Sequence, residues 1–125
     1  MEGVPRELRL DVRDDICRIA REALHNAVRH AMAQQIRVKI THGADSLRLE
    51  VLDNGKGMEP RVLEQGGRAG HWGLVGMRER AARIGATLEI SSNPGRGTDI
   101  SLTLPAKRAY EPSQTRKRWW SLRSR

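Results

Sequence analysis

Hydrophobic residues recur with helical spacing along the first long segment of the chain, residues 11–34. At about 100° per residue, the apolar side chains of this segment share one broad face of a helix. They are Ile16, Ala20, Leu24, Ala27, Val28 and Ala31. Asp11, Asp14 and Asp15 stand at its start, where negative charge suits a helix cap and the positive end of the helix dipole. The pattern predicts one long amphipathic helix.

Apolar and polar residues alternate in four later segments. Residues 35–42 and 46–55 alternate around the turn HGAD, and residues 86–93 and 98–105 alternate around the turn NPGRG. A period of two is typical of half-buried strands, and such turns join antiparallel neighbours. The sequence therefore predicts two β-hairpins. We also expect a short strand over residues 6–12, before the first helix.

A second helical pattern follows residues 53–76, a stretch that is rich in glycine and has no regular period. Its apolar positions are Leu74, Met77, Ala81 and Ile84, and Gly85 ends it. An irregular segment of this length inside a small domain usually carries function. The order helix, two strands, loop, helix, two strands predicts an α+β fold with the helices on one face of a mostly antiparallel sheet.

The composition is that of one soluble globular domain: 125 residues, of which 38% are hydrophobic and 30% charged. No run reaches the roughly 18 apolar residues that a membrane helix needs, and the N-terminus has no apolar signal segment. The single cysteine, Cys17, lies between Ile16 and Ile19, so we expect a buried structural thiol.

The net charge of +8 is concentrated near the C-terminus. Residues 106–125 hold seven basic residues against one acidic residue, a balance of +6, whereas residues 1–105 hold sixteen against fourteen, a balance of +2. The charge therefore gives little support to nucleic-acid binding by the folded part. We expect a domain over residues 1–105 and a disordered basic tail over residues 106–125, in which Trp119 and Trp120 are either solvated or available to an anionic membrane or a partner.

Three polar side chains in the first helix are spaced four residues apart: Glu22, Asn26 and His30, with Arg29 beside them. They lie opposite Leu24 and Val28 on the expected helix. A carboxylate, an amide oxygen and a cation in one row suit a hard metal ion and phosphate oxygens. By itself, the same row also describes the solvated side of an amphipathic helix.

Two glycine-containing segments suggest close approach of the backbone to a ligand. In DNGKGM, Asp53–Met58, an aspartate ends an apolar strand, and Gly55 and Gly57 let the backbone pass a flat ring; an ordinary turn is the alternative. GHWGLVGM, residues 70–77, leads into a helix and can aim N–H groups at a phosphate. It is neither a Walker A loop, which needs Lys-Ser or Lys-Thr, nor a Rossmann fingerprint, which needs a strand directly before it.

The final hairpin supplies a third glycine pair. Gly95 and Gly97 fit a tight turn, and Thr98 opens the last strand with a hydroxyl that can reach the same site. Alone, this segment is only a turn.

Four segments, taken in order, resemble the N, G1 and G2 boxes of the GHKL ATPase superfamily. They are E-x-x-x-N-x-x-x-H, D-x-G-x-G, G-x-x-G-L-x-G-M and G-x-G-T. The resemblance is closest to the catalytic ATP-binding domain of bacterial sensor histidine kinases and covers about residues 8–105. The absence of phenylalanine, the short lid and GLVGMRERA followed by GA are similar to the subclass whose response regulators carry helix-turn-helix domains.

This resemblance implies a two-layer sandwich of the Bergerat type that binds ATP and Mg²⁺ beneath a lid over residues 58–69. It implies that Asp53 accepts a hydrogen bond from the adenine amino group, that Gly57 lets the ring approach and that Thr98 supports the same end. Asn26 would hold Mg²⁺, with Glu22 as a nearby metal or water-orienting carboxylate. The remaining nucleotide-binding positions implied are Arg29, His30, Gly55, Met58, Gly70, Gly73, Leu74 and Gly76.

In a histidine kinase the phosphate acceptor is an imidazole on a separate helical dimerisation domain. None of His25, His30, His42 and His71 has that context. We therefore expect a module that binds nucleotide but does not autophosphorylate alone. Its expected partners are ATP, the histidine-bearing dimerisation domain of a parent kinase and a downstream response regulator, without direct nucleic-acid binding. The expected location is the cytoplasmic portion of a membrane-anchored kinase, with membrane contact only through the parent.

Two alternatives remain at this point. An anti-sigma-factor serine kinase shares the fold and the boxes, and would phosphorylate a serine on an antagonist protein. A non-enzymatic basic module would bind nucleic acid or membrane through its tail, with an affinity that falls steeply with salt and survives loss of Asp53.

Overall fold

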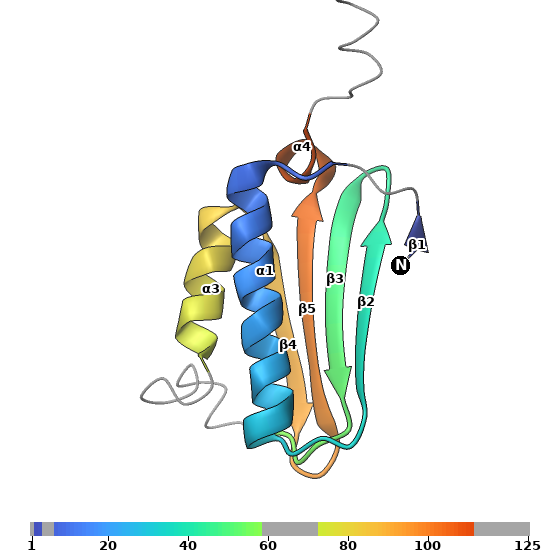
Figure 1. The fold of residues 1–125 in the computed structure, drawn as a ribbon, viewed down its shortest axis with the longest axis vertical. Coiled ribbons are helices and arrows are strands. Elements are labelled where there is room, and N and C mark those ends of the chain that lie inside the picture. The colour runs from blue at the N-terminus through green and yellow to red at the C-terminus, as the bar shows by residue number, and fades with distance from the viewer. Residues whose placement is uncertain (1, 4–6, 59–72, 112–125) are drawn as a thin grey trace, which may run out of the picture.

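The computed structural model describes residues 2–3, 7–58 and 73–111, which form one sheet and its covering helices (Figure 1). The elements in chain order are β1 (Glu2–Gly3), α1 (Leu10–His25), the π-helical turn η1 (Asn26–His30), β2 (Ile36–His42), β3 (Ser46–Asp53), α3 (Leu74–Arg83), β4 (Thr87–Asn93), β5 (Gly97–Pro105) and α4 (Ala106–Ala109). Within these ranges, no helix is long and apolar enough to cross a membrane.

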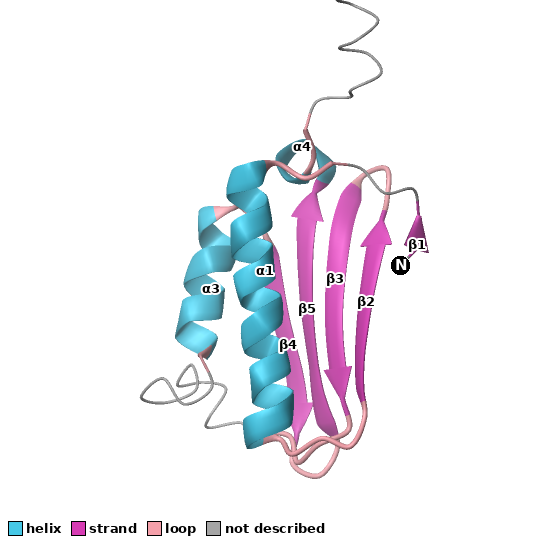
Figure 2. Cartoon of the chain, viewed as in Figure 1, coloured by secondary structure: helices cyan, strands magenta, loops and turns pink. Residues whose placement is uncertain are grey.

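The sheet has five strands in the order β1-β2-β3-β5-β4. Every neighbouring pair is antiparallel except β1, which runs parallel to β2. Figure 2 shows α1 and α3 together on one face of this sheet. The expected α+β two-layer fold, with helices on one face of a mixed and mostly antiparallel sheet, is confirmed.

The core lies between the sheet and the two long helices. The inward side chains of the two central strands pair across the sheet: Leu49 lies opposite Leu102, and Val51 opposite Ile100. Ile19 of α1 and Leu74 and Met77 of α3 close the other side; Ile19 is 1% exposed, and both α3 residues are fully buried. The strand alternation therefore predicted the buried face of β3 and β5 correctly, whereas Val38 of β2 is 47% exposed.

The buried side of α1 differs from the sequence-based prediction. Leu24 and Val28, expected on the apolar face, are 37% and 62% exposed, whereas Asn26 is only 3% exposed. The reason is the position of α3, which packs beside the polar side of α1: Arg83 donates to Asp15, and Glu22 contacts Gly73. Which side of a helix faces a neighbouring helix cannot be derived from that helix's own periodicity.

Two smaller predictions near the N-terminus are also wrong. Cys17 is exposed because it lies on the outer side of α1, so it is not a buried structural thiol. The strand expected over residues 6–12 is reduced to a single bridge between Leu8 and Tyr110, because α1 already begins at Leu10.

The fold continues past Pro105. Ala109 is fully buried and Tyr110 is 2% exposed, and the Tyr110 ring stacks on His42 with 6.2 Å between centroids. The apolar residues at 106, 109 and 110 join a core cluster with Val12 and Leu104. The expected boundary at residue 105 therefore falls too early. Residues 112–125, including Trp119 and Trp120, lie outside the described residues, so the expected disordered tail stays a prediction.

The outer face of the sheet carries polar side chains, and one of them is expected to reduce stability at neutral pH. Partial burial, and then the nearby Glu50 carboxylate, raise the pKa of Asp99, while Arg48 opposes the shift. A carboxyl group whose pKa is raised by folding disfavours the native state when ionised, and this cost disappears as the pH falls through its folded pKa. We therefore expect Asp99→Asn to raise the melting temperature at about pH 7, with a gain that shrinks toward about pH 4.

Thermal unfolding of the Asp99→Asn variant and the wild type across this pH range measures the effect. Asp45→Asn, an exposed carboxyl group in the turn between β2 and β3, is the matched control and should leave the melting temperature nearly unchanged. A variant at Asp99 that melts below the wild type at neutral pH would contradict the expected direction.

Candidate functional site

Polar side chains from three strands meet at one end of the sheet, on the face that carries the helices. Asp53 at the end of β3 lies opposite Thr98 on β5, and Thr98 lies opposite Ser92 on β4. Thr98 and Ser92 are 6% and 7% exposed, and Asp53 is half-buried. The two residues that the sequence singled out here, Asp53 and Thr98, therefore lie side by side.

Ser92 was missed by the sequence analysis, although its hydroxyl joins three parts of this site. Its Oγ accepts the N–H of Met58 at 2.7 Å, donates to the carbonyl of Gly97 at 3.0 Å, and lies 2.8 Å from the Thr98 hydroxyl oxygen. A signal was present in the sequence. Ser92 continues the inward positions of Leu88 and Ile90 on β4, so a polar residue occupies a position where the alternation calls for an apolar one.

The segment Asp53–Met58 is held tightly to the elements around it. The Asp53 carboxylate accepts the N–H of Gly55 at 2.8 Å, and Asn54 Oδ1 accepts the N–H groups of Gln34 and Gln35, each at 2.9 Å. On its other side, the N–H of Lys56 donates to the carbonyl of Ala31 at 2.9 Å. This segment therefore does more than turn the chain, because it connects η1 to the strand ends.

The glycines at this end mark close backbone crossings. Gly57 has a φ of +75°, and a Cβ added there would lie 2.0 Å from the Asn93 carbonyl oxygen. At Gly55 an added Cβ would lie 2.5 Å from the Ala31 carbonyl oxygen. The structure thus gives these two glycines a role within the chain itself, in addition to any approach of a flat ring.

Met58 was expected to contact nucleotide and to begin the lid. Its side chain is 2% exposed and belongs to the main core cluster. It therefore anchors the end of the segment rather than moving with a lid. The remainder of the expected lid, residues 59–69, and Gly70 lie outside the described residues.

The polar row of α1 lies toward the beginning of α3. Asn26 is buried at the start of η1, Glu22 is half-buried and Arg29 is exposed. A Cβ added to Gly73 would lie 2.5 Å from Glu22 Oε2, so the carboxylate lies directly against this glycine. The side chain of His30 lies outside the described part of the structure.

Two of these backbone segments have unusual conformations. Gly73 precedes α3 with a left-handed φ of +65°, after which Leu74 enters the core and Gly76 follows within the first turn. The chain at η1 widens into a π-helical turn, in which the N–H of Ala31 donates to the carbonyl of Asn26 at 2.8 Å. Such turns are frequent at functional sites.

The described residues contain no cluster of three or more histidine, cysteine, aspartate or glutamate side chains that could hold a metal ion. Mg²⁺ does not need one, because it often binds through one or two protein groups together with substrate phosphates and water. The Asn26 amide and the Glu22 carboxylate supply oxygen donors of this kind. They fit a magnesium ion that is shared with a nucleotide and do not form an autonomous metal centre.

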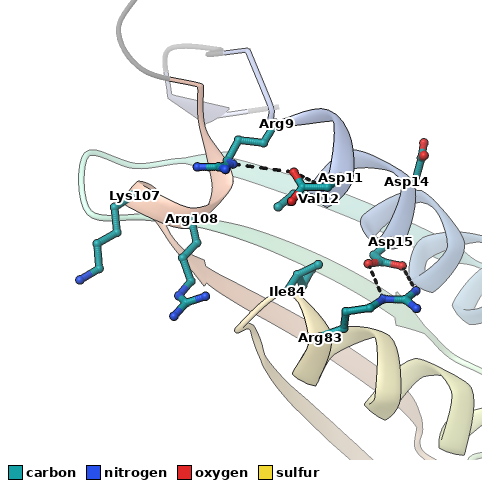
Figure 3. Close-up of a pocket in the computed structure, with 9 residues that line it drawn as sticks. All are labelled: Arg9, Asp11, Val12, Asp14, Asp15, Arg83, Ile84, Lys107 and Arg108. Atoms are coloured by element: carbon teal, nitrogen blue, oxygen red, sulfur yellow. Dashed lines mark hydrogen bonds and ion pairs between the residues drawn. The ribbon is translucent and has the colours of Figure 1, made fainter.

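Hollows occur at opposite ends of the domain. At the strand ends, one of about 200 Å³ is lined by nine residues, among them Asp53, Ser92 and Thr98 together with Leu52, Ser91 and Asp99, and another of about 580 Å³ is lined by seven residues, among them Asp53 and Asn54. At the other end, one of about 550 Å³ lies where α1 begins and α3 ends, beside α4 (Figure 3). In it, Arg83 donates through Nε to Asp15 at 3.1 Å and through a second nitrogen to the other carboxylate oxygen. Because Asp15 is 7% exposed, this bidentate pair fastens α3 to α1 and is structural.

Three features define the class of Bergerat-type ATPases: the two-layer sandwich, the aspartate at a strand end and the glycine that precedes α3. The chain belongs to the histidine kinase-, DNA gyrase B- and HSP90-like ATPase family, whose model matches residues 11–108. The family resemblance stated from the four sequence segments is thereby confirmed.

Sequence relatives place the chain more narrowly. It is 40% identical over 94 residues to the sensor histidine kinase LiaS of Bacillus subtilis, covering 75% of this chain and 25% of that protein. It is 40% identical over 98 residues to the sensor protein VraS of Staphylococcus haemolyticus, covering 78% and 27%. The chain spans about a quarter of the length of these relatives, and it corresponds to the ATP-binding catalytic domain of sensor histidine kinases.

Solved structures agree on the fold. The histidine kinase domain of the blue-light activated kinase EL346 from Erythrobacter litoralis superposes with a TM-score of 0.71 at 20% identity, covering 86% of this chain and 53% of that one. The ATP-binding domain of PrrB from Mycobacterium tuberculosis gives 0.62 at 23% identity, covering 80% and 69%.

Proposed function

We propose that this chain binds Mg·ATP at the strand-end site and donates the γ-phosphate to a histidine on the dimerisation domain of a longer sensor kinase. The observation that carries the proposal is the pairing of Asp53 with Thr98 at one end of the sheet, on the side where Glu22 lies against Gly73. One nucleotide can then place its base against the acceptor groups at the strand ends and its phosphates at the start of α3.

Each end of this site has a chemical role in the proposal. The Asp53 carboxylate is held by a hydrogen bond from the N–H of Gly55, and it accepts a hydrogen bond from the adenine amino group beside Thr98. At the other end, Gly73, Leu74 and Gly76 begin a helix whose N–H groups favour phosphate oxygens. Arg29 and His30 are the further nucleotide contacts that we propose on the first helix, and Gly70 is the further one in the second glycine segment.

Transfer of a phosphoryl group requires mainly positioning and charge neutralisation. A bond forms from an imidazole nitrogen to the γ-phosphorus, and the bond from that phosphorus to the bridging oxygen breaks, with ADP as the leaving group. Mg²⁺ neutralises phosphate charge when bound. Asn26 would hold it through the amide oxygen, and Glu22 would orient the ion or its water. No residue of this chain is required as the acceptor, so the isolated chain should not label itself.

The partners follow from the same proposal. They are the histidine-bearing dimerisation domain of the parent, and a response regulator that later receives the phosphate. We also propose that the chain acts on the cytoplasmic side of a membrane-anchored kinase and reaches the membrane only through the parent. The serine-kinase alternative is not favoured, because the relatives identified above are sensor histidine kinases.

A phosphotransfer assay tests the proposal. The chain is incubated with Mg²⁺ and γ-labelled ATP, alone and with the separately purified helical hairpin of its parent. We expect acid-labile label on the hairpin, no label on the chain alone, and no label on a hairpin whose histidine is replaced by glutamine. Acid-stable label on a serine of an antagonist protein would instead establish the serine-kinase alternative. Absence of Mg·ATP binding would overturn the proposal altogether.

A further inference from the structure

The hydroxyl of Ser92 makes three hydrogen bonds in a buried position, and together they leave one consistent arrangement of hydrogens. A serine hydroxyl has one hydrogen to donate and two lone pairs to accept with. The N–H of Met58 can only donate, so it occupies one lone pair. The carbonyl of Gly97 can only accept, so it takes the single Ser92 hydrogen.

These two bonds fix the direction of the third hydrogen bond, the one between Ser92 and Thr98. The Thr98 hydroxyl oxygen lies 2.8 Å from Ser92 Oγ, where only the second lone pair of Ser92 remains. Thr98 must therefore donate its own hydrogen to Ser92. Since a threonine hydroxyl has a single hydrogen, Thr98 can offer only lone pairs to a ligand. Both side chains are at least nine-tenths buried, so bulk water cannot readily replace these bonds.

The neighbour of Thr98 across the sheet has the same polarity. Asp53 lies opposite Thr98, and an ionised carboxylate is also an acceptor without a donor. The two side chains therefore present an edge that matches an amino group and has no hydrogen for a keto oxygen. Adenine carries an amino group at position 6 of the ring, where guanine and hypoxanthine carry a keto oxygen.

We propose that Ser92 is a positioning residue that sets base selectivity. It accepts the hydrogen bond that the Thr98 hydroxyl donates, and this leaves Thr98 as an acceptor for 6-amino purine nucleotides and not for 6-keto ones. This inference rests on the proposed binding of ATP at the strand ends. It adds a residue that acts through Thr98, and it assigns the selectivity to the direction of one hydrogen bond.

Replacing Ser92 by alanine releases the Thr98 hydrogen. The Thr98 hydroxyl can then rotate and donate to a keto oxygen, while Asp53 still favours an amino group. Loss of the partner of Met58 N–H weakens the binding of every nucleotide alike. The informative quantity is therefore the ratio of the dissociation constants for Mg·ITP and Mg·ATP, because inosine triphosphate replaces the 6-amino group of ATP with a keto oxygen. We expect this ratio to fall about tenfold in Ser92→Ala, as suits one hydrogen bond.

Isothermal titration of the 125-residue chain with both nucleotides measures the ratio, and circular dichroism monitors folding. Ser101→Ala is the matched control, because Ser101 is a serine of β5 with 5% exposure whose Oγ has no hydrogen-bond partner in the described part of the chain. It should leave the ratio unchanged. Thr98→Val should lower the ratio on its own, and adding Ser92→Ala to Thr98→Val should change it no further, because Ser92 acts through Thr98.

The outcomes separate this inference from the proposed function. Equal ratios in the wild type and Ser92→Ala, or an additive double variant, would overturn the role of Ser92 while leaving ATP binding intact. A wild type that binds ITP as tightly as ATP would overturn it in the same way. A wild type that binds neither nucleotide would overturn the proposed function itself. If Ser92→Ala does not fold, an unchanged ratio in Thr98→Val still contradicts the inference.

Discussion

Loss of the Asp53 carboxylate is expected to abolish measurable Mg·ATP binding at micromolar protein concentration. Asp53→Ala removes the acceptor proposed for the adenine amino group and also the partner of the Gly55 N–H, which holds the following segment. A hydrogen bond to a charged group contributes about 1.5–3 kcal/mol, and an unpaired donor left in a buried site costs about 1–3 kcal/mol more. Because about 1.4 kcal/mol corresponds to a tenfold change, affinity should fall well beyond tenfold.

Two further variants show which of these losses matters. Asp53→Asn can keep an oxygen toward Gly55 but turns one ligand-facing acceptor into a donor, so it should weaken ATP binding strongly while leaving the fold in place. Asp45→Ala removes an exposed carboxylate from the turn between β2 and β3 and should have no effect on affinity. Calorimetric titration measures all three. An Asp53→Ala variant with wild-type affinity would show that the adenine end has been placed wrongly.

Gly97→Ala is expected to be one of the two most destabilising glycine-to-alanine substitutions at the site, together with Gly57→Ala, whose added Cβ would also lie 2.0 Å from a backbone oxygen. A Cβ at Gly97 would lie 2.0 Å from the backbone oxygen of Asp53, and the φ of +86° is itself unfavourable for alanine. The clash is with backbone of the neighbouring strand, so it cannot be relieved by a side-chain rotation. We expect a loss of several kcal/mol, a large part of the roughly 5–15 kcal/mol that stabilises a small domain, and loss of ATP binding with it.

Gly95→Ala provides the matched comparison in the same hairpin. Its φ of +78° is similar, but an added Cβ meets nothing within 4 Å. It should therefore cost only the conformational strain of about 1–2 kcal/mol and leave the site intact. Urea unfolding of both variants measures the difference. If the two glycine variants were equally stable, backbone contact at Gly97 would not be the reason for glycine there.

Most of the fold could be predicted from the chain because strands and helices record their environment at fixed periods. The alternation in residues 86–93 and 98–105 placed β4 and β5 within one residue, and Gly85 marked the end of α3 within two. The side of α1 that is buried could not be predicted. Leu24 and Val28 are as apolar as the residues that face the core, and only the packing of α3 against Asp15 and Glu22 decides between the two sides.

In the candidate site, too, some residues could be predicted from the sequence and others could not. The sequence singled out Asp53, Thr98 and the glycines because each is unusual at its own position in the chain. Ser92 is ordinary by itself and becomes notable only when its three partners surround it. Met58 is a different case: it follows the glycines directly and its side chain belongs to the core, and its contact with nucleotide stays a prediction.

The amino-acid sequence by itself determined the class of fold, the family and the segments that form the site, because periodicity, turn residues and short motifs depend on neighbours along the chain. The tertiary structure alone decided that Asn26 is buried, that Gly57 and Gly97 are required by other backbone segments, and that Ser92 restricts Thr98. These features depend on contacts between residues far apart in the chain. Such contacts are fixed only when the sheet register and the packing of α3 against α1 bring the segments together.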